Sequence, residues 1–143
     1  MIAFMKRILT AIFLCALCLL CYSQQKTLTL GSPVENLEKS QSRVLIPNNE
    51  LVESHDIMMD GVNYTIGIRE CKIVYIGTSD EKFRVDNLRV GAPISENLLD
   101  RELGYTPGWG YYIKMDSGWY AGFDFSKKPT EETPIKFFFK FDF

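Results

Sequence analysis

The apolar and polar positions of the chain fall into two similar halves. Residues 28–34 (LTLGSPV) align without gaps with residues 88–94 (LRVGAPI), and both read apolar, any, apolar, glycine, small, proline, β-branched. A turn sequence follows each copy at a similar place, Asp60-Gly61 in the first half and Asp116-Ser117-Gly118 in the second. Two landmarks in the same order predict an internal duplication of one structural unit.

Each copy of this motif is followed by the spacing of a short helix. Ser32 to Glu35 has the form of a capping box with proline at the first helical position, which is a common start of a helix. Apolar residues then recur at helical intervals: Val34 with Leu37 in the first half, and Ile94 with Leu98, Leu99 and Leu103 in the second. The pattern predicts one helix after each motif.

Beyond each predicted helix, apolar residues alternate with polar ones, which is the period of a half-buried strand. The clearest alternation places Val62, Tyr64, Ile66 and Ile68 on one side of a strand. The strands predicted in this way are 51–59, 62–69 and 72–78 in the first half, with a short one over 43–46, and 109–115, 119–126 and 135–143 in the second.

Together these elements predict an α+β fold. It consists of two tandem helix-plus-antiparallel-sheet units (α-β-β-β repeated) that form one curved sheet with helices on one face. The first unit covers residues 24–79 and the second covers residues 88–143, with a polar link over residues 80–87.

The segment LRVGAPISENLLDRELG, Leu88 to Gly104, resembles a helix motif of the SmpA/OmlA (BamE-type) outer-membrane lipoproteins. A tandem pair of helix-plus-sheet units is in turn similar to the architecture of the β-lactamase inhibitor proteins. The resemblance implies a small secreted module that binds another protein through its sheet, without catalysis.

The first 23 residues have the pattern of a secretory signal peptide. Lys6 and Arg7 precede an apolar run from Ile8 to Cys21, which is shorter than the roughly 18 residues that a membrane-spanning helix needs. We therefore expect cleavage after Ser23, no stable membrane insertion of the mature protein, and a secreted or periplasmic location.

Cleavage would leave 120 residues with one cysteine, Cys71, so no internal disulfide could form and the fold would depend on packing. Cys71 begins an apolar run, which predicts a buried and unreactive thiol. Loss of Lys6 and Arg7 leaves 14 basic residues against 18 acidic ones, scattered singly or in pairs. This balance argues against nucleic acid or an anionic membrane as the partner.

The region richest in aromatic residues is the predicted hairpin over residues 109–125. With Asp116-Ser117-Gly118 as its loop, the facing pairs are Met115–Trp119, Ile113–Ala121 and Tyr111–Phe123. The largely apolar side is assigned to the core: Trp109, Tyr111, Ile113, Met115, Trp119, Ala121, Phe123 and Phe125. The other side is amphipathic and forms the candidate binding face: Tyr112, Lys114, Tyr120 and Asp124, joined by Phe138 as an exposed ring if its strand pairs alongside.

From this face we expect a non-catalytic module that binds an unidentified protein partner. The alternative is a carbohydrate- or small-ligand-binding module in which Trp109 or Trp119 provides a stacking surface. A small hydrolase is a further alternative, and it would need His55, the only histidine, or an acid pair such as Asp56 and Asp60. No cofactor or metal motif is present in the sequence, so neither is expected. The oligomeric state is left open.

Overall fold

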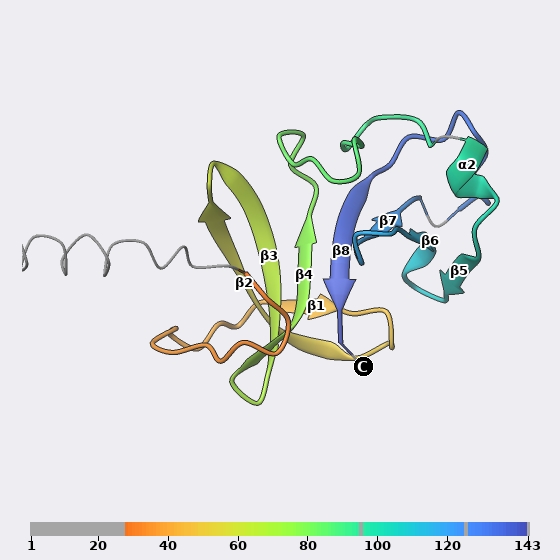
Figure 1. Cartoon of the computed structure of the whole chain (residues 1–143). Coiled ribbons are helices and arrows are strands. Elements are labelled where there is room, and N and C mark those ends of the chain that lie inside the picture. The colour runs from red at the N-terminus through yellow and green to blue at the C-terminus, as the bar shows by residue number, and fades with distance from the viewer. Residues whose placement is uncertain (1–27, 95, 125, 143) are drawn as a thin grey trace, which may run out of the picture.

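The computed structural model describes residues 28–94, 96–124 and 126–142, so the predicted signal peptide over residues 1–23 lies outside the described residues. The described chain forms one antiparallel sheet of eight strands in the order β1-β2-β3-β4-β8-β7-β6-β5 (Figure 1). Its strands are β1 (Arg43–Leu45), β2 (Leu51–Met59), β3 (Val62–Arg69), β4 (Lys72–Thr78), β5 (Leu103–Thr106), β6 (Gly110–Lys114), β7 (Tyr120–Gly122) and β8 (Phe137–Phe141).

The fold is therefore essentially all-β, and the predicted α+β class is wrong. The one helical element in the described residues is a single turn, α2 (Glu96–Leu99), and the chain after Pro33 forms no helix. No helix in this part of the chain has the length and apolar composition needed to cross a membrane.

The glycine of each motif explains why the helices do not form. Gly31 and Gly91 have positive φ angles of 79° and 83°, as the third residue of a type II turn requires. In each turn the residue after the glycine donates its N–H to the carbonyl three positions earlier, at 3.2 Å. The serine and proline that suggested a helix start thus follow a turn, and the chain continues extended.

The extended part of each motif pairs with the start of the last strand of its own half, at the first residues of β4 in the first half and just before β8 in the second. The glycine N–H donates to the carbonyl of Ile73 in the first half and of Ile135 in the second, at 2.8 Å in both. Pro33 and Pro93 occupy bridge positions between the hydrogen bonds of this short ladder. Proline has no N–H to donate, and these are positions where none is needed.

The two halves of the sheet correspond strand for strand. Strands β1 to β4 form one antiparallel meander, β5 to β8 form another, and the two meet where β4 pairs with β8. The predicted strands 51–59, 62–69 and 72–78 are confirmed with these bounds. Strand β5 was missed because Leu103 was assigned to the second helix. The unit that a duplication would repeat is therefore four strands, and the duplication itself stays a prediction.

One side of the sheet, here called the outer face, is covered by the two motif segments. Residues 28–34 pack over Ile66, Ile73 and Ile76. Residues 83–99 pack over a second apolar cluster that includes Ile113, Ala121 and Phe138. Irregular chain thus supplies the cover that the sequence analysis assigned to helices.

The opposite side, here called the inner face, lies inside the curl of the sheet. Its apolar residues are Val44, Val52, Tyr75, Trp109, Tyr112, Tyr120, Phe137, Phe139 and Phe141. The Trp109 Nε1–H donates a hydrogen bond of 2.7 Å to the carbonyl of Leu45, 64 positions earlier in the chain. Because this bond joins the β5–β6 connection to β1, the two ends of the sheet meet across the inner face, and the sheet forms a half-barrel.

Candidate functional site

Aromatic rings cover much of the inner face between β4 and β6. The ring of Tyr120 stacks on that of Phe139 with centroids 5.0 Å apart and planes 16° from parallel. Trp109 meets Phe139 edge-on at 4.3 Å. Strand β8 contributes Phe137, Phe139 and Phe141 to this face because alternate residues of a strand share one side. The rings pack against one another and form an apolar floor.

The inner face is hollowed where β4 ends and β8 begins. A space of about 590 Å³ lies there between residues of β2, β3, β4 and the start of β8. Its volume is within the range of small-ligand pockets, roughly 300–1,000 Å³. We call it the inner hollow, and the residues that give it its chemistry are Asp56, Thr65, Tyr75, Asp80, Lys136 and Phe137.

Tyr75 forms the floor of the inner hollow. Its ring lies over Gly77, where an added Cβ would collide with the tyrosine hydroxyl. Tyr75 is only 6% exposed, and no group among the described residues hydrogen-bonds to its hydroxyl. Every fully enclosed side-chain polar atom in the described chain has a hydrogen-bond partner. The Tyr75 hydroxyl has none, so it is not fully enclosed and opens into the hollow that Tyr75 lines. Burial raises the pKa of Tyr75 well above its usual range, so the hydroxyl stays protonated and can both donate and accept.

One wall of the inner hollow is a hydrogen-bonded loop around Asp80. The Asp80 carboxylate accepts the backbone N–H of Asn63 and that of Lys82, each at 2.9 Å. The Thr78 hydroxyl donates to the Asn63 carbonyl at 2.7 Å. The N–H groups of Asn63 and Lys82 lower the pKa of Asp80, so this wall carries a negative charge at neutral pH. These bonds tie the β2–β3 hairpin to the end of β4.

Two further charged residues line the inner hollow, and the strands that carry or adjoin them lie on either side of β4, the strand of Tyr75. Asp56 belongs to β2, and one of its oxygens accepts the Thr65 hydroxyl at 2.7 Å. Lys136 directly precedes β8. Within the described residues, the second Asp56 oxygen and the Lys136 ammonium have no hydrogen-bond partner in the protein. The hollow thus offers an acceptor, a donor and a tyrosine hydroxyl to a bound molecule.

The residues of the candidate binding face lie together, but inside the curl. Tyr112, Lys114 and Tyr120 share the inner face, and Tyr120 pairs with Lys114 in the predicted register. The two tyrosines are half-buried, with ring centroids 5.7 Å apart, and the Lys114 ammonium lies 5.9 Å from the Tyr120 ring. Asp124 is exposed. The tyrosines are therefore part of the packing of the inner face, while Lys114 and Asp124 remain on the surface.

Phe138 does not join these residues as the sequence analysis expected. It is 0% exposed and lies in the cluster of the outer face. The cause is the register between β7 and β8, which pairs Ala121 with Phe138 and Tyr120 with Phe139. Phe139 therefore occupies the place beside Tyr120.

Trp109 also lies on a different face from the one predicted. It was grouped with Ile113, but it is buried on the inner face. Gly108 and Gly110, on either side of it, have positive φ angles of 78° and 104°. The backbone turns at these glycines, so the alternation of β6 does not extend to Trp109.

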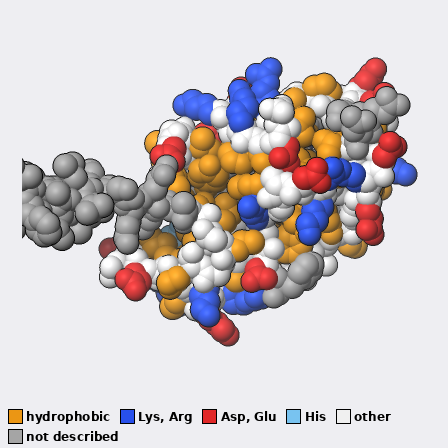
Figure 2. Space-filling view, in the orientation of Figure 1, with side chains coloured by type: hydrophobic (Ala, Val, Ile, Leu, Met, Phe, Trp, Pro, Cys, Tyr) orange, Lys and Arg blue, Asp and Glu red, His pale blue; other side chains and the backbone are white. Residues whose placement is uncertain are grey.

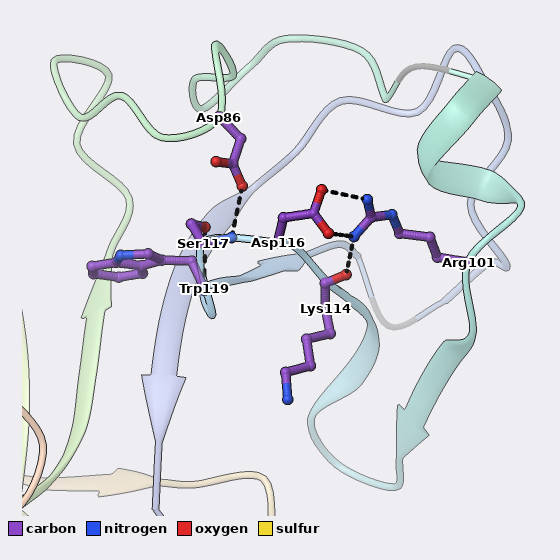
Figure 3. Close-up of polar contacts among 6 residues, drawn as sticks. All are labelled: Asp86, Arg101, Lys114, Asp116, Ser117 and Trp119. Atoms are coloured by element: carbon purple, nitrogen blue, oxygen red, sulfur yellow. Dashed lines mark hydrogen bonds and ion pairs between the residues drawn. The ribbon is translucent and has the colours of Figure 1, made fainter.

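The turn between β6 and β7 is held from two sides (Figure 3). Arg101 makes a two-pronged ion pair with Asp116, at 2.9 and 2.8 Å. The Asp86 carboxylate accepts the backbone N–H of Ser117 at 3.3 Å. The hydrogen bond between Met115 and Trp119 across this turn confirms the predicted three-residue loop.

The other residues weighed for chemistry lie apart from the inner hollow. Trp119 packs with the clusters of the outer face, and the Lys140 ammonium lies 5.1 Å from its ring. The His55 ring nitrogen lies 2.9 Å from a carboxylate oxygen of Glu53. Cys71 is exposed, contrary to the expected burial, because it lies with positive φ in the tight turn between β3 and β4. In the part of the chain that the structure describes, no three His, Cys, Asp or Glu residues gather as a metal site.

Large hydrophobic side chains on the surface are spread along the sheet. The most exposed are Leu37 before β1, Leu51 and Met58 on β2, and Tyr105 on β5. On the side seen in Figure 2, hydrophobic side chains reach the surface over β3, β4 and β8 among charged side chains of both signs. The inner hollow combines an apolar floor with polar groups that have no partner among the described residues.

Sequence reasoning missed Tyr75 and Gly77, although a signal was present. They lie two positions apart in the run CKIVYIGT and so share one face of a strand. An aromatic residue beside a glycine on one face is a known way to pack a ring flat on a sheet. The run was used only to predict the strand 72–78 and the burial of Cys71.

Comparisons with known proteins identify no relative of this chain. No family model matches it, no curated protein matches it, and no solved structure matches it. The resemblance to the BamE-type lipoproteins and the β-lactamase inhibitor proteins thus rests on the motif alone. In the structure, Leu88–Gly104 forms a bridge, a turn and one helical turn before entering β5.

Proposed function

We propose that this protein is a non-catalytic binding protein that holds a small organic molecule in the inner hollow. The observation that carries the proposal is the Tyr75 hydroxyl, which belongs to a side chain only 6% exposed, has no partner among the described residues and opens into the hollow. A hydrogen bond to a neutral hydroxyl contributes about 0.5–1.5 kcal/mol net of the exchange with water. A molecule that enters the hollow and pairs with this hydroxyl would gain that contribution.

The walls of the inner hollow support the same proposal. Small-molecule pockets combine a largely apolar lining with a few fixed polar groups that set the orientation of the ligand. Here Tyr75 and Phe137 supply the apolar lining, and the loop around Asp80 is fixed by its hydrogen bonds. We place this binding in the secretory or periplasmic space on the basis of the predicted signal peptide.

The protein-binding function expected from the sequence stays a prediction. Its two tyrosines, Tyr112 and Tyr120, are half-buried among the rings of the inner face. A small ligand is favoured over a docked protein because the hollow is a concave space of about 590 Å³ whose lining includes the Tyr75 hydroxyl, which has no partner among the described residues.

The experiment uses Trp109 as a reporter of the inner hollow. Its ring lies 5.1 Å from that of Phe137 and 6.3 Å from that of Tyr75, and both residues line the hollow. The chain has two tryptophans, so Trp119→Phe leaves Trp109 alone. Titration of this variant with neutral trisaccharides, tyramine and octanoate should give a saturable change in emission for one class, together with a raised melting temperature.

The matched control is Trp109→Phe, which keeps only Trp119 on the outer face. Addition of the same molecule should cause no saturable change in its emission, since Trp119 lies on the outer face. A panel in which no class changes either the Trp109 emission or the melting temperature would contradict the proposed function.

A further inference from the structure

We infer that the inner hollow takes a short, uncharged saccharide, an inference that rests on the proposed function of this site. Its unpaired polar groups differ in kind: the second Asp56 oxygen accepts, the Lys136 ammonium donates, and the Tyr75 hydroxyl does both. A ligand hydroxyl is also both donor and acceptor. A molecule with several hydroxyls can therefore satisfy all three positions.

The charges around the hollow favour a neutral ligand. The Asp80 carboxylate is already engaged by the N–H groups of Asn63 and Lys82. This leaves Asp56 and Lys136 as the free charges, one of each sign, on different strands of the lining. A cation would meet Lys136 and an anion would meet Asp56, whereas neutral hydroxyls can bond to both.

The aromatic lining also fits a saccharide. Sugar rings have apolar C–H faces, and these pack against the electron-rich faces of aromatic rings. Tyr75 and Phe137 both line the hollow, and the Phe137 ring is held flat over Gly122, where an added Cβ would collide with it. A purely apolar chain, such as that of a fatty acid, would pack on these rings but would make no hydrogen bond with the Tyr75 hydroxyl, Asp56 or Lys136.

This site differs from the stacking surface of Trp109 or Trp119 that the sequence analysis gave as an alternative. Trp109 is 8% exposed and is committed to its hydrogen bond with Leu45, and Trp119 packs with the outer face. The saccharide is instead assigned to the floor formed by Tyr75 and Phe137.

The test is isothermal titration calorimetry of the purified protein with maltotriose, cellotriose and chitotriose. At least one should bind, and Tyr75→Phe should weaken its binding by about two- to tenfold, because one hydrogen bond to the hydroxyl is lost. Tyr105→Phe is the matched control, since Tyr105 is exposed on the edge strand β5 and should leave affinity unchanged. Circular dichroism verifies that each variant is folded.

Asp56→Asn provides a second, independent variant. It keeps the size and an accepting oxygen but removes the charge, so a neutral saccharide should retain most of its affinity. A cationic ligand such as tyramine should lose most of its affinity.

The outcomes separate this inference from the proposed function. If tyramine or octanoate binds in a Tyr75-dependent way and no trisaccharide does, the saccharide inference is overturned while the binding function stands. If a trisaccharide binds equally well to Tyr75→Phe, the assignment to this hollow is overturned. If none of the probes binds, both proposals fail.

Discussion

Three glycines of the inner face leave room for aromatic rings that pack over them. An added Cβ would collide with a ring at each of them: Gly77 with Tyr75, Gly104 with Tyr112, and Gly122 with Phe137. Two of these pairs face one another across neighbouring strands, Gly104–Tyr112 and Gly122–Phe137. Because each ring lies flat over a glycine, the layer of side chains on the inner face is thin at these points. The shape of the hollow depends on these flat rings.

At the same scale, Asp80 makes the stability of the fold depend on pH. The N–H groups of Asn63 and Lys82 hold the pKa of its carboxyl below the ordinary value of 3.8. Because the folded-state pKa is the lower one, the carboxylate stabilises the fold above pH 3.8, and this contribution is lost as the pH falls through the folded-state pKa.

We therefore expect Asp80→Asn to lower the urea midpoint at neutral pH and to converge with the natural protein in acid. Asp100→Asn, at an exposed position, should leave the midpoint nearly unchanged at pH 7. A difference between Asp80→Asn and the natural protein that persists undiminished below the folded-state pKa would contradict this role of Asp80.

At the scale of elements, the strands of the first half were predictable, whereas the helices were not and β5 was missed. Of the strands over 51–78, the middle one alternates strictly and follows an Asp-Gly turn, and all three have the predicted bounds. The motif Gly-Ser-Pro-Val satisfies two signals at once, since Ser and Pro suit a helix start and Gly suits a type II turn. Leu37, the residue that completed the helical spacing, is 44% exposed, so a helix there would have little apolar surface to bury.

Mutations in the motif distinguish the turn from the predicted helix. Gly31→Ala and Gly91→Ala should each lower the free energy of unfolding by about 1 kcal/mol, because both glycines need positive φ and neither has atoms nearby for a new Cβ to contact. Ser32→Ala should cost less than about 0.5 kcal/mol, whereas loss of a helix cap typically costs about 1 kcal/mol. Chemical denaturation measures all three. A larger loss for Ser32→Ala than for Gly31→Ala would favour the helix.

At the scale of the whole molecule, the sequence placed Trp109 and Phe138 on the wrong faces and did not show which way the sheet curls. Alternation correctly grouped Tyr112, Lys114 and Tyr120. The direction of curl depends on contacts between distant segments, above all the hydrogen bond from Trp109 to Leu45. The inner hollow could not be predicted for the same reason, since its lining comes from separate strands in both halves of the chain.

The central claim is that the curled sheet leaves the Tyr75 hydroxyl unpaired by protein and open to a ligand. The most direct test is the free energy of unfolding of Tyr75→Phe without any ligand, measured by urea denaturation beside the natural protein. We predict no loss of stability, since deletion of a hydroxyl without a protein partner removes no intramolecular hydrogen bond. A loss of more than about 1 kcal/mol, the usual contribution of a hydrogen bond, would show that the hydroxyl is already paired within the protein and would contradict the account.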